Sequence, residues 1–137
     1  MIICGFPGVG KSTVARDMGG VVDLESTPFK KDFDMYLNVA IHMHNNGYTP
    51  LVSSHEEMRE KLINSGVKFK VVIPKLTDKD IYMRNYKYRG STEEFIKLLD
   101  ENFDKWILDI MSDVRLRDKL IILDHDKYID DYIEDID

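Results

Sequence analysis

The pattern G-x-x-x-x-G-K-[ST] occurs close to the N-terminus, and all of its fixed positions are present in Gly5–Ser12 (GFPGVGKS). A short apolar run, Met1–Cys4, comes directly before it, and a helical pattern over residues 11–18 follows it. Glycines allow the backbone between a strand and a helix to turn its N–H groups inward without Cβ clashes. The chain is therefore expected to begin with a strand, a tight loop and a helix. We call the loop Gly5–Ser12 the cradle.

The cradle predicts a binding site for phosphate groups. Its inward N–H groups and the positive N-terminal end of the following helix both attract anions. Lys11 is expected to reach the β- and γ-phosphates of ATP, the Ser12 hydroxyl to bind Mg²⁺, and Thr13 to contact the region of the α-phosphate. The predicted ATP-binding residues are Gly8, Val9, Gly10, Lys11, Ser12 and Thr13. The alternative is a glycine-rich turn with an incidental lysine, and four fixed positions in the correct context argue against it.

The rest of the chain alternates short apolar runs with longer amphipathic segments. The runs are continuous and rich in Val and Ile, which is typical of strands covered on both faces. They are Met1–Cys4, Gly20–Leu24, Thr49–Ser53, Lys68–Ile73 and Lys119–Leu123. Five strands that alternate with helices predict an α/β domain with a parallel sheet, whose ligands bind at the carboxyl ends of the strands.

Helix starts and stops can also be predicted. Ser54, Thr77 and Ser91 each precede an acidic residue by three positions, which is the spacing of a capping box. Gly47 and Gly66 stand where helices are expected to end, just before a strand. Apolar residues recur at helical spacing over 33–44 and again over 95–110, the longest helical segment.

Composition limits the possible partners and the compartment. A chain of 137 residues fits one domain, and its net charge of -6 argues against a general nucleic-acid binder. The single cysteine, Cys4, excludes an intramolecular disulfide and is expected to be a small core residue in a reducing compartment. No apolar stretch is long enough to span a bilayer, and no secretory signal is recognisable. We expect a cytoplasmic protein without a membrane partner, either a monomer or a homodimer.

Several classes of nucleotide-binding protein can be set aside. A GTPase would carry an Asn-Lys-x-Asp guanine motif after a later strand, and none occurs. A motor or transporter ATPase usually has a strand that ends in an acidic pair, whereas the third run here ends in Ser53-Ser54-His55. The chain is also short for such machines. Small-molecule kinases remain.

Three segments besides the cradle extend this inference. They are Asp23–Thr27 (DLEST), Val52–Glu57 (VSSHEE) and Tyr82–Gly90 (YMRNYKYRG). Together with the cradle they resemble the nucleoside monophosphate kinase-like group of P-loop kinases, and more narrowly the compact nucleotide kinases of bacteriophage genomes. The resemblance implies a three-layer α/β/α P-loop kinase fold over residues 1–137, with strand order 2-3-1-4-5. It also implies ATP as donor, Mg²⁺ as cofactor and a minimal helical lid at about residues 77–95.

The resemblance implies that lid arginines, here Arg84 and Arg89, act in catalysis together with Lys11. Closing arginines stabilise the negative charge that spreads over a phosphoryl group during transfer. Arg84 and Arg89 are five residues apart and cannot share one face of a continuous helix, so Arg89-Gly90 is interpreted as a helix end that turns back toward the nucleotide. The alternative is a solvated basic face, because Lys79 and Lys87 lie nearby.

Asp23 and Glu25 follow the second run and are candidate substrate-binding residues. A carboxylate there could hold a magnesium-bound water, contact a substrate hydroxyl or accept its proton. Asp23 comes first because it stands closest to the strand end. A turn or capping role ahead of Ser26-Thr27-Pro28 explains these carboxylates equally well.

Ser54, His55 and Arg59 follow the third run and are the other candidate substrate-binding residues. His55 could donate a hydrogen bond to the substrate or act as a base, and Arg59 could hold a substrate phosphate with its guanidinium fork. The alternatives are that Ser54 only caps a helix and that Arg59 pairs with a nearby Glu. Relatives carry an acidic residue near this strand end, so the magnesium shell here is expected to fall to Asp23.

Some aromatic and acidic residues admit more than one interpretation. Tyr82, Tyr86 and Tyr88 could stack on a nucleobase or pack between helices. Trp106 stands at core spacing and is interpreted as packing rather than base stacking. The tail from Asp130 to Asp137 has the composition of a solvated terminal helix face.

The sequence therefore predicts an ATP-dependent kinase for a small nucleotide, a (deoxy)nucleoside monophosphate. A kinase for a hydroxyl acceptor, either a nucleoside or a small sugar acid, and a non-catalytic nucleotide-binding protein are the two alternatives. In the hydroxyl case Asp23 would be the base, because a hydroxyl acceptor needs one.

Overall fold

The computed structural model describes residues 1–132, which form one five-stranded parallel sheet with helices on both faces. Its strands are β1 (Ile2–Gly5), β2 (Val21–Asp23), β3 (Thr49–Ser53), β4 (Phe69–Pro74) and β5 (Leu120–Leu123). Their spatial order is β2-β3-β1-β4-β5, and every neighbouring pair is parallel. The predicted α/β class, the five parallel strands, the three-layer arrangement and the order 2-3-1-4-5 are confirmed.

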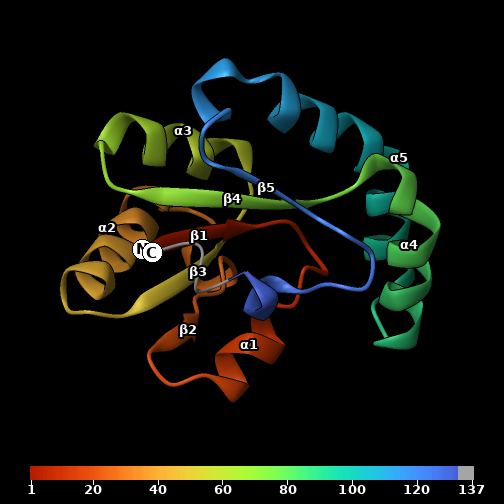
Figure 1. Ribbon diagram of the computed structural model, residues 1–137, viewed down its shortest axis with the longest axis horizontal. Helices are drawn as coiled ribbons and strands as arrows, with labels where there is room; N and C mark the ends of the chain where they lie inside the picture. The colour runs from red at the N-terminus through yellow and green to blue at the C-terminus, as the bar shows by residue number, and fades with distance from the viewer. Residues whose placement is uncertain (133–137) are drawn as a thin grey trace.

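Five α-helices connect the strands. They are α1 (Lys11–Asp17), α2 (Phe33–Asn45), α3 (Glu56–Ser65), α4 (Lys79–Tyr88) and α5 (Glu93–Ser112). Right-handed crossovers put α1 on one face of the sheet and α2, α3 and the α4–α5 pair on the other. In Figure 1, α1 lies well apart from α3 and α5, and the C-terminal end of α5 comes close to α3. No described helix is long and apolar enough to cross a membrane.

The core lies along the central strand. Ile2, Ile3 and Cys4 of β1 are fully buried, as expected for a continuous apolar run between two layers of helices. Burying each isoleucine side chain contributes about 1.5–3 kcal/mol. The Cys4 thiol donates to Ser53 O at 3.2 Å, and burial raises its pKa to about 12, so it is a protonated core residue as expected.

The helix caps differ in detail from those predicted. The side chain of Thr92, not Ser91, caps α5 by accepting from the N–H of Phe95 at 3.1 Å. The N-cap residue of α3 is His55 rather than Ser54, and that of α4 is Asp78 rather than Thr77; neither makes a side-chain cap bond. A 3₁₀ turn over Leu76–Asp78 runs straight into α4 and displaces the cap predicted at Thr77.

The predicted helix ends agree with the structure. Gly66 follows α3 with a φ of 72°, and Gly47 follows α2 with a φ of 86°. These are left-handed conformations that glycine adopts without strain.

The predicted lid region, residues 77–95, forms a helical hairpin. It comprises α4, a short turn and the start of α5, and the two helices pack together. In the turn, Gly90 has a φ of 78° and the Ser91 N–H donates to Tyr86 O at 3.1 Å. The expected hairpin is thus present, with glycine where the chain reverses.

The segment after β5 returns to the cradle. Ile129 is fully buried, and its N–H donates to Val9 O at 3.3 Å. A 3₁₀ turn over Ile129–Asp131 contains the first part of the acidic tail. Residues 133–137, on which most of the predicted solvated helix face falls, lie outside the described residues.

Candidate functional site

The cradle has the geometry that its glycines predict. Gly8 and Gly10 have φ angles of 92° and 100°, a conformation that other residues rarely adopt. Space is also restricted, because a Cβ at Gly8 would lie 2.9 Å from a ring carbon of Tyr86, and one at Gly10 would lie 3.0 Å from Tyr128. Both glycines are therefore required by backbone conformation and by packing.

Two tyrosines of α4 hold the cradle from the side of the hairpin. Tyr86 is fully buried and its hydroxyl donates to Pro7 O at 2.6 Å, while Tyr82 packs edge-on against Tyr86 at 6.4 Å. Burial raises the pKa of Tyr86, so its hydroxyl keeps its proton and remains a donor. Of the two interpretations of these tyrosines, packing is the one that the structure supports. Tyr88 is different, since 92% of its surface is exposed.

Lys11 and Ser12 are the last two residues of the cradle and the first two residues of α1. The Lys11 ammonium donates to Gly5 O at 2.5 Å across the cradle. Its pKa is lowered by burial and further by Arg89, although Cys4 and Asp23 partly oppose this effect. A desolvated cation with one backbone partner attracts an anion strongly.

Asp23, at the carboxyl end of β2, lies beside Ser12. The Ser12 hydroxyl donates to Asp23 Oδ2 at 2.9 Å. The described residues contain no group of three or more His, Cys, Asp or Glu side chains that could hold a metal ion. A hydroxyl and a carboxylate nevertheless suit Mg²⁺, because this ion keeps several waters and takes its other ligands from substrate phosphates.

The two lid arginines have different positions. Arg89, just after α4, has its guanidinium 5.4 Å from the centre of the Tyr86 ring and is close enough to influence the pKa of Lys11. Arg84 is exposed and makes no ion pair or hydrogen bond with the described residues. On the helix it stands two residues from both Tyr82 and Tyr86, so it points away from the cradle. The structure therefore brings Arg89 to the site and does not bring Arg84 there.

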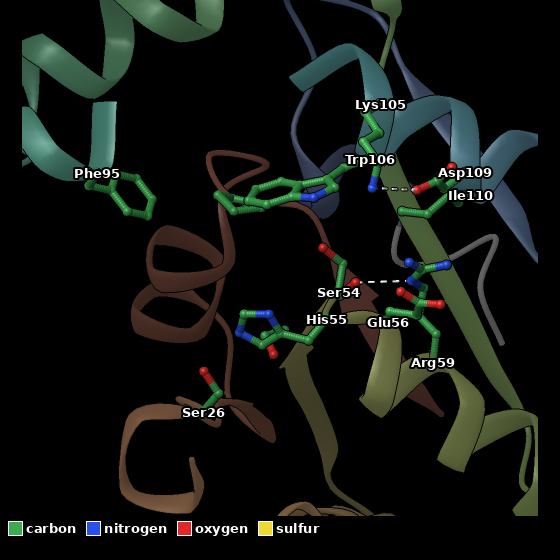
Figure 2. Close-up of a pocket in the computed structure, with 12 residues that line it drawn as sticks. Ser26, Ser54, His55, Glu56, Arg59, Phe95, Lys105, Trp106, Asp109 and Ile110 are labelled. Carbon is green, nitrogen blue, oxygen red and sulfur yellow. Dashed lines mark hydrogen bonds and ion pairs between the residues drawn. The ribbon is translucent and has the colours of Figure 1, made fainter. Parts of the chain in front are cut away.

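A cavity of about 310 Å³ lies next to the cradle, between the N-terminal end of α3 and the middle of α5 (Figure 2). We call it the α3–α5 cavity. Residues from five parts of the chain line it: Pro7, Ser26, Ser53, Ser54, His55, Glu56, Arg59, Phe95, Lys105, Trp106, Asp109 and Ile110. Ser54, His55 and Arg59, predicted to bind substrate, are thus brought together.

Arg59 is the only buried arginine of the described residues, with 7% of its surface exposed. Its Nε donates to Ser54 O at 3.0 Å, and it forms no ion pair with a described residue. The neighbouring Glu60 is bound instead by Arg115, through hydrogen bonds of 3.1 and 2.5 Å. The alternative in which Arg59 pairs with a nearby Glu is therefore not seen among the described residues, although the carboxylates of Glu56 and Asp109 also line the cavity.

His55 lines the same cavity as Arg59. Its ring packs against Phe33 at 5.7 Å between centroids. Burial lowers the pKa of His55, and the charges of Lys11, Lys30 and Arg59 lower it further. The imidazole is consequently neutral near pH 7 and can donate or accept one hydrogen bond.

The two strand ends beside the cavity are held apart by Tyr36 of α2. The last regular bond between these strands runs from Leu24 N–H to Leu51 O at 2.9 Å. Beyond it, the buried Tyr36 hydroxyl donates to Leu24 O at 2.5 Å and accepts from the Ser53 N–H at 3.0 Å. This hydroxyl stands where a direct strand-to-strand bond would otherwise form, so it separates the carboxyl ends of β2 and β3.

The remaining predicted residues do not reach the cavity. Thr13 and Glu25 are exposed, and neither lines the cavity or makes a side-chain hydrogen bond with a described residue. Asp23 is directed to Ser12 rather than to the cavity.

Other functional candidates were not predicted from the sequence. Tyr36, Phe95, Lys105 and Asp109 belong to helical patterns that explain them without a ligand. Trp106 was expected to be core packing, yet it is only partly buried and lines the cavity. The position of Trp106 on the helix could have indicated its place in the cavity, because it lies beside the buried stripe of α5 and not within it. That stripe consists of Leu99, Phe103, Ile107 and Ile110.

No family model, no curated protein and no solved structure matches this chain. The case for its function therefore depends on the geometry of the cradle and of the cavity beside it.

Proposed function

We propose that this chain is an ATP-dependent phosphotransferase whose acceptor is a (deoxy)nucleoside monophosphate. The observation that carries the proposal is Arg59, a buried guanidinium that forms no ion pair with a described residue, in a cavity that begins at Pro7 of the cradle. An anion bound there would lie next to the donor phosphates.

The cost of burying a charge supports an anionic ligand. A buried cation destabilises a folded protein by several kcal/mol unless an anion or hydrogen bonds compensate its charge. Arg59 donates to one backbone acceptor and forms no ion pair with a described carboxylate; Glu60 is engaged by Arg115. Glu56 and Asp109 also line the cavity, but neither forms an ion pair with Arg59. A phosphate of the acceptor would supply the missing charge and match the fork of the guanidinium.

On the donor side, the cradle would hold the phosphates of ATP. Lys11 would leave Gly5 O for the β- and γ-phosphates, and the Ser12 hydroxyl with Asp23 would hold Mg²⁺ and its waters. Magnesium supplies charge neutralisation on the transferred group when it is bound.

Transfer to a phosphate acceptor needs no strong base. An oxygen of the acceptor phosphate attacks the γ-phosphorus, the bond from that phosphorus to the bridging oxygen of ATP breaks, and ADP leaves with the electron pair. Lys11 and Arg89 would stabilise the charge on the transferred group, and Arg59 would position the acceptor. His55, neutral at this pH, would donate a hydrogen bond to the acceptor.

The hydroxyl-acceptor alternative requires a base at the cavity. Asp23 was the candidate, but it accepts a hydrogen bond from Ser12 and does not line the cavity. This position argues against Asp23 as the base, so a hydroxyl acceptor would have to use His55, Glu56 or Asp109 of the cavity lining.

An acceptor panel tests the proposal. ADP release would be followed with nucleoside monophosphates, deoxynucleoside monophosphates, nucleosides and sugar acids, each with ATP and Mg²⁺, and Lys11→Ala as control. We expect stimulation by one or more monophosphates and none by nucleosides. A rate that no acceptor raises above that of ATP alone would leave only the non-catalytic alternative, and stimulation by a nucleoside or sugar acid alone would favour the hydroxyl acceptor.

A further inference from the structure

One wall of the α3–α5 cavity is aromatic. Trp106 and Phe95, both on α5, are partly buried and line the cavity. Figure 2 shows the indole of Trp106 nearly edge-on, with Ser54 and His55 on one side of its plane. One face of the ring is thus directed to the same space that Arg59 borders.

The position of Trp106 on the helix explains why its ring is available. The buried stripe of α5 consists of Leu99, Phe103, Ile107 and Ile110, and these fill the core. Trp106 lies beside this stripe, and no described residue accepts a hydrogen bond from its indole N–H. An aromatic ring with a free polar edge is typical of a surface that binds a ligand.

Phe95 is held in place by the same contacts that hold the cradle. Its ring packs edge-on against Tyr86 at 5.8 Å and 82°, and Tyr86 donates to Pro7 O. The aromatic wall is therefore connected to the phosphate site through one buried side chain.

The chemistry of the cavity is divided between its two sides. Arg59 offers a buried positive charge, and Trp106 and Phe95 offer flat apolar surface; the pair Lys105–Asp109 (3.6 Å) stands at the edge. A ligand that matches both sides has an anionic group and a planar aromatic group. A sugar phosphate or sugar acid has only the first.

We propose that Trp106 is the surface on which the nucleobase of the acceptor stacks, and that it selects acceptors that carry a base. The inference rests on the proposed function in that it takes the cavity as the acceptor site. It adds the orientation of the acceptor, with its phosphate at Arg59 and its base at α5.

Intrinsic fluorescence tests this directly, because Trp106 is the only tryptophan of the chain. Wild-type protein without ATP would be titrated with purine and pyrimidine nucleoside monophosphates, ribose 5-phosphate and inorganic phosphate. We expect saturable quenching by at least one nucleoside monophosphate and none by ribose 5-phosphate. No change with any nucleotide, or equal change with ribose 5-phosphate, would overturn the inference.

Variants separate stacking from a structural role. Trp106→Leu is expected to raise the KM for the acceptor about 10- to 100-fold with little change in kcat, whereas Trp106→Phe retains most of the affinity. Tyr48→Leu, which removes an exposed aromatic ring outside the cavity, is the matched control and should leave KM unchanged. Thermal melting of all three variants shows whether they fold.

The outcomes distinguish the inference from the proposed function. If monophosphates are phosphorylated but Trp106→Leu has the wild-type KM, the inference is wrong and the proposed function stands. If no acceptor is phosphorylated while a nucleoside monophosphate quenches Trp106, the base-stacking surface stands and the proposed transfer is wrong.

Discussion

The cradle and the α3–α5 cavity are neighbours, but they are built in different ways. The cradle is one continuous segment, Gly5–Ser12, whose glycines, lysine and serine define its geometry wherever a strand leads in and a helix leads out. The cavity collects residues from five parts of the chain, and only the order of the strands brings them together. A local motif identifies the expected donor, whereas the proposed acceptor site is a product of the tertiary structure.

The largest expected effect comes from the donor side. Lys11→Ala removes the charge that would contact the transferred phosphoryl group, and we expect turnover with every acceptor to fall by at least about 10²- to 10³-fold. Steady-state ADP release measures it. Because Lys11 is not part of the cavity lining, acceptor quenching of Trp106 should persist in this variant. A variant with wild-type turnover would contradict the role of the cradle.

The second prediction compares the two arginines of the hairpin. Arg89→Ala is expected to lower kcat by about 10²-fold, since Arg89 lies near Lys11 and would contact the developing charge. Arg84→Ala makes the same change of charge on the outward face of α4 and should alter kcat by less than about threefold, as expected for an exposed site that has no partner within residues 1–132. Equal losses in both variants would show that α4 reorients during the reaction.

The third prediction concerns the acceptor side alone. Arg59→Met removes the buried guanidinium, and the KM for a phosphate acceptor should rise about 10- to 100-fold, as for a lost charged hydrogen bond. The affinity for ATP should remain unchanged. Because a buried cation that forms no ion pair with a described residue is replaced by an apolar side chain, the free energy of unfolding should stay the same or increase.

A purely structural Arg59 would behave in the opposite way. Arg59→Met would then lower the melting temperature and leave the acceptor KM unchanged. Lys61→Met, on the same helix, is a matched control, because Lys61 pairs with Asp34 and does not line the cavity.

The smallest effect is a shift in the titration of His55. Its pKa lies below the ordinary value because of burial and the nearby cations, so a phosphate bound at Arg59 should raise it. Histidine NMR resonances, followed with and without a nucleoside monophosphate, measure this change, and the resonances of His42 serve as control. No change at saturating ligand would place the phosphate away from His55.

The same depressed pKa has a consequence for stability. Folded protein binds fewer protons at His55 than the unfolded chain, so this group's contribution to stability is complete above pH 6.5, the ordinary value for histidine. It is lost as the pH falls from there through the folded pKa. In Arg59→Met one of the cations that oppose protonation of His55 is absent, so the stability lost at low pH should become smaller.

Much of the fold could be predicted from the sequence because its signals are local. Continuous apolar runs predicted the ends of all five strands to within one residue, because strands buried on both faces show no alternation of polar and apolar residues that could be misread. The caps were less predictable. Ser54, Thr77 and Ser91 have the right spacing, yet a 3₁₀ turn or a one-residue shift moves the start of each helix.

The lining of the cavity could be predicted only in part. Ser54, His55 and Arg59, which line it, were predicted as site residues because ligands gather at the carboxyl ends of strands. Tyr36 and Trp106 were not, since the sequence does not reveal which side of a helical stripe faces a cavity rather than the core. The position of Arg84 could not be predicted either, because its spacing from Arg89 does not reveal that Tyr82 and Tyr86 are the residues of α4 that contact the cradle.

The most direct test of the central claim is to follow the label of [γ-³²P]ATP in the wild-type chain and in Arg59→Met. The account predicts that wild-type protein transfers the label to a nucleoside monophosphate, and that Arg59→Met does so only at about 10- to 100-fold higher acceptor concentration. Label released only as inorganic phosphate, at a rate that the acceptor does not change, would contradict it.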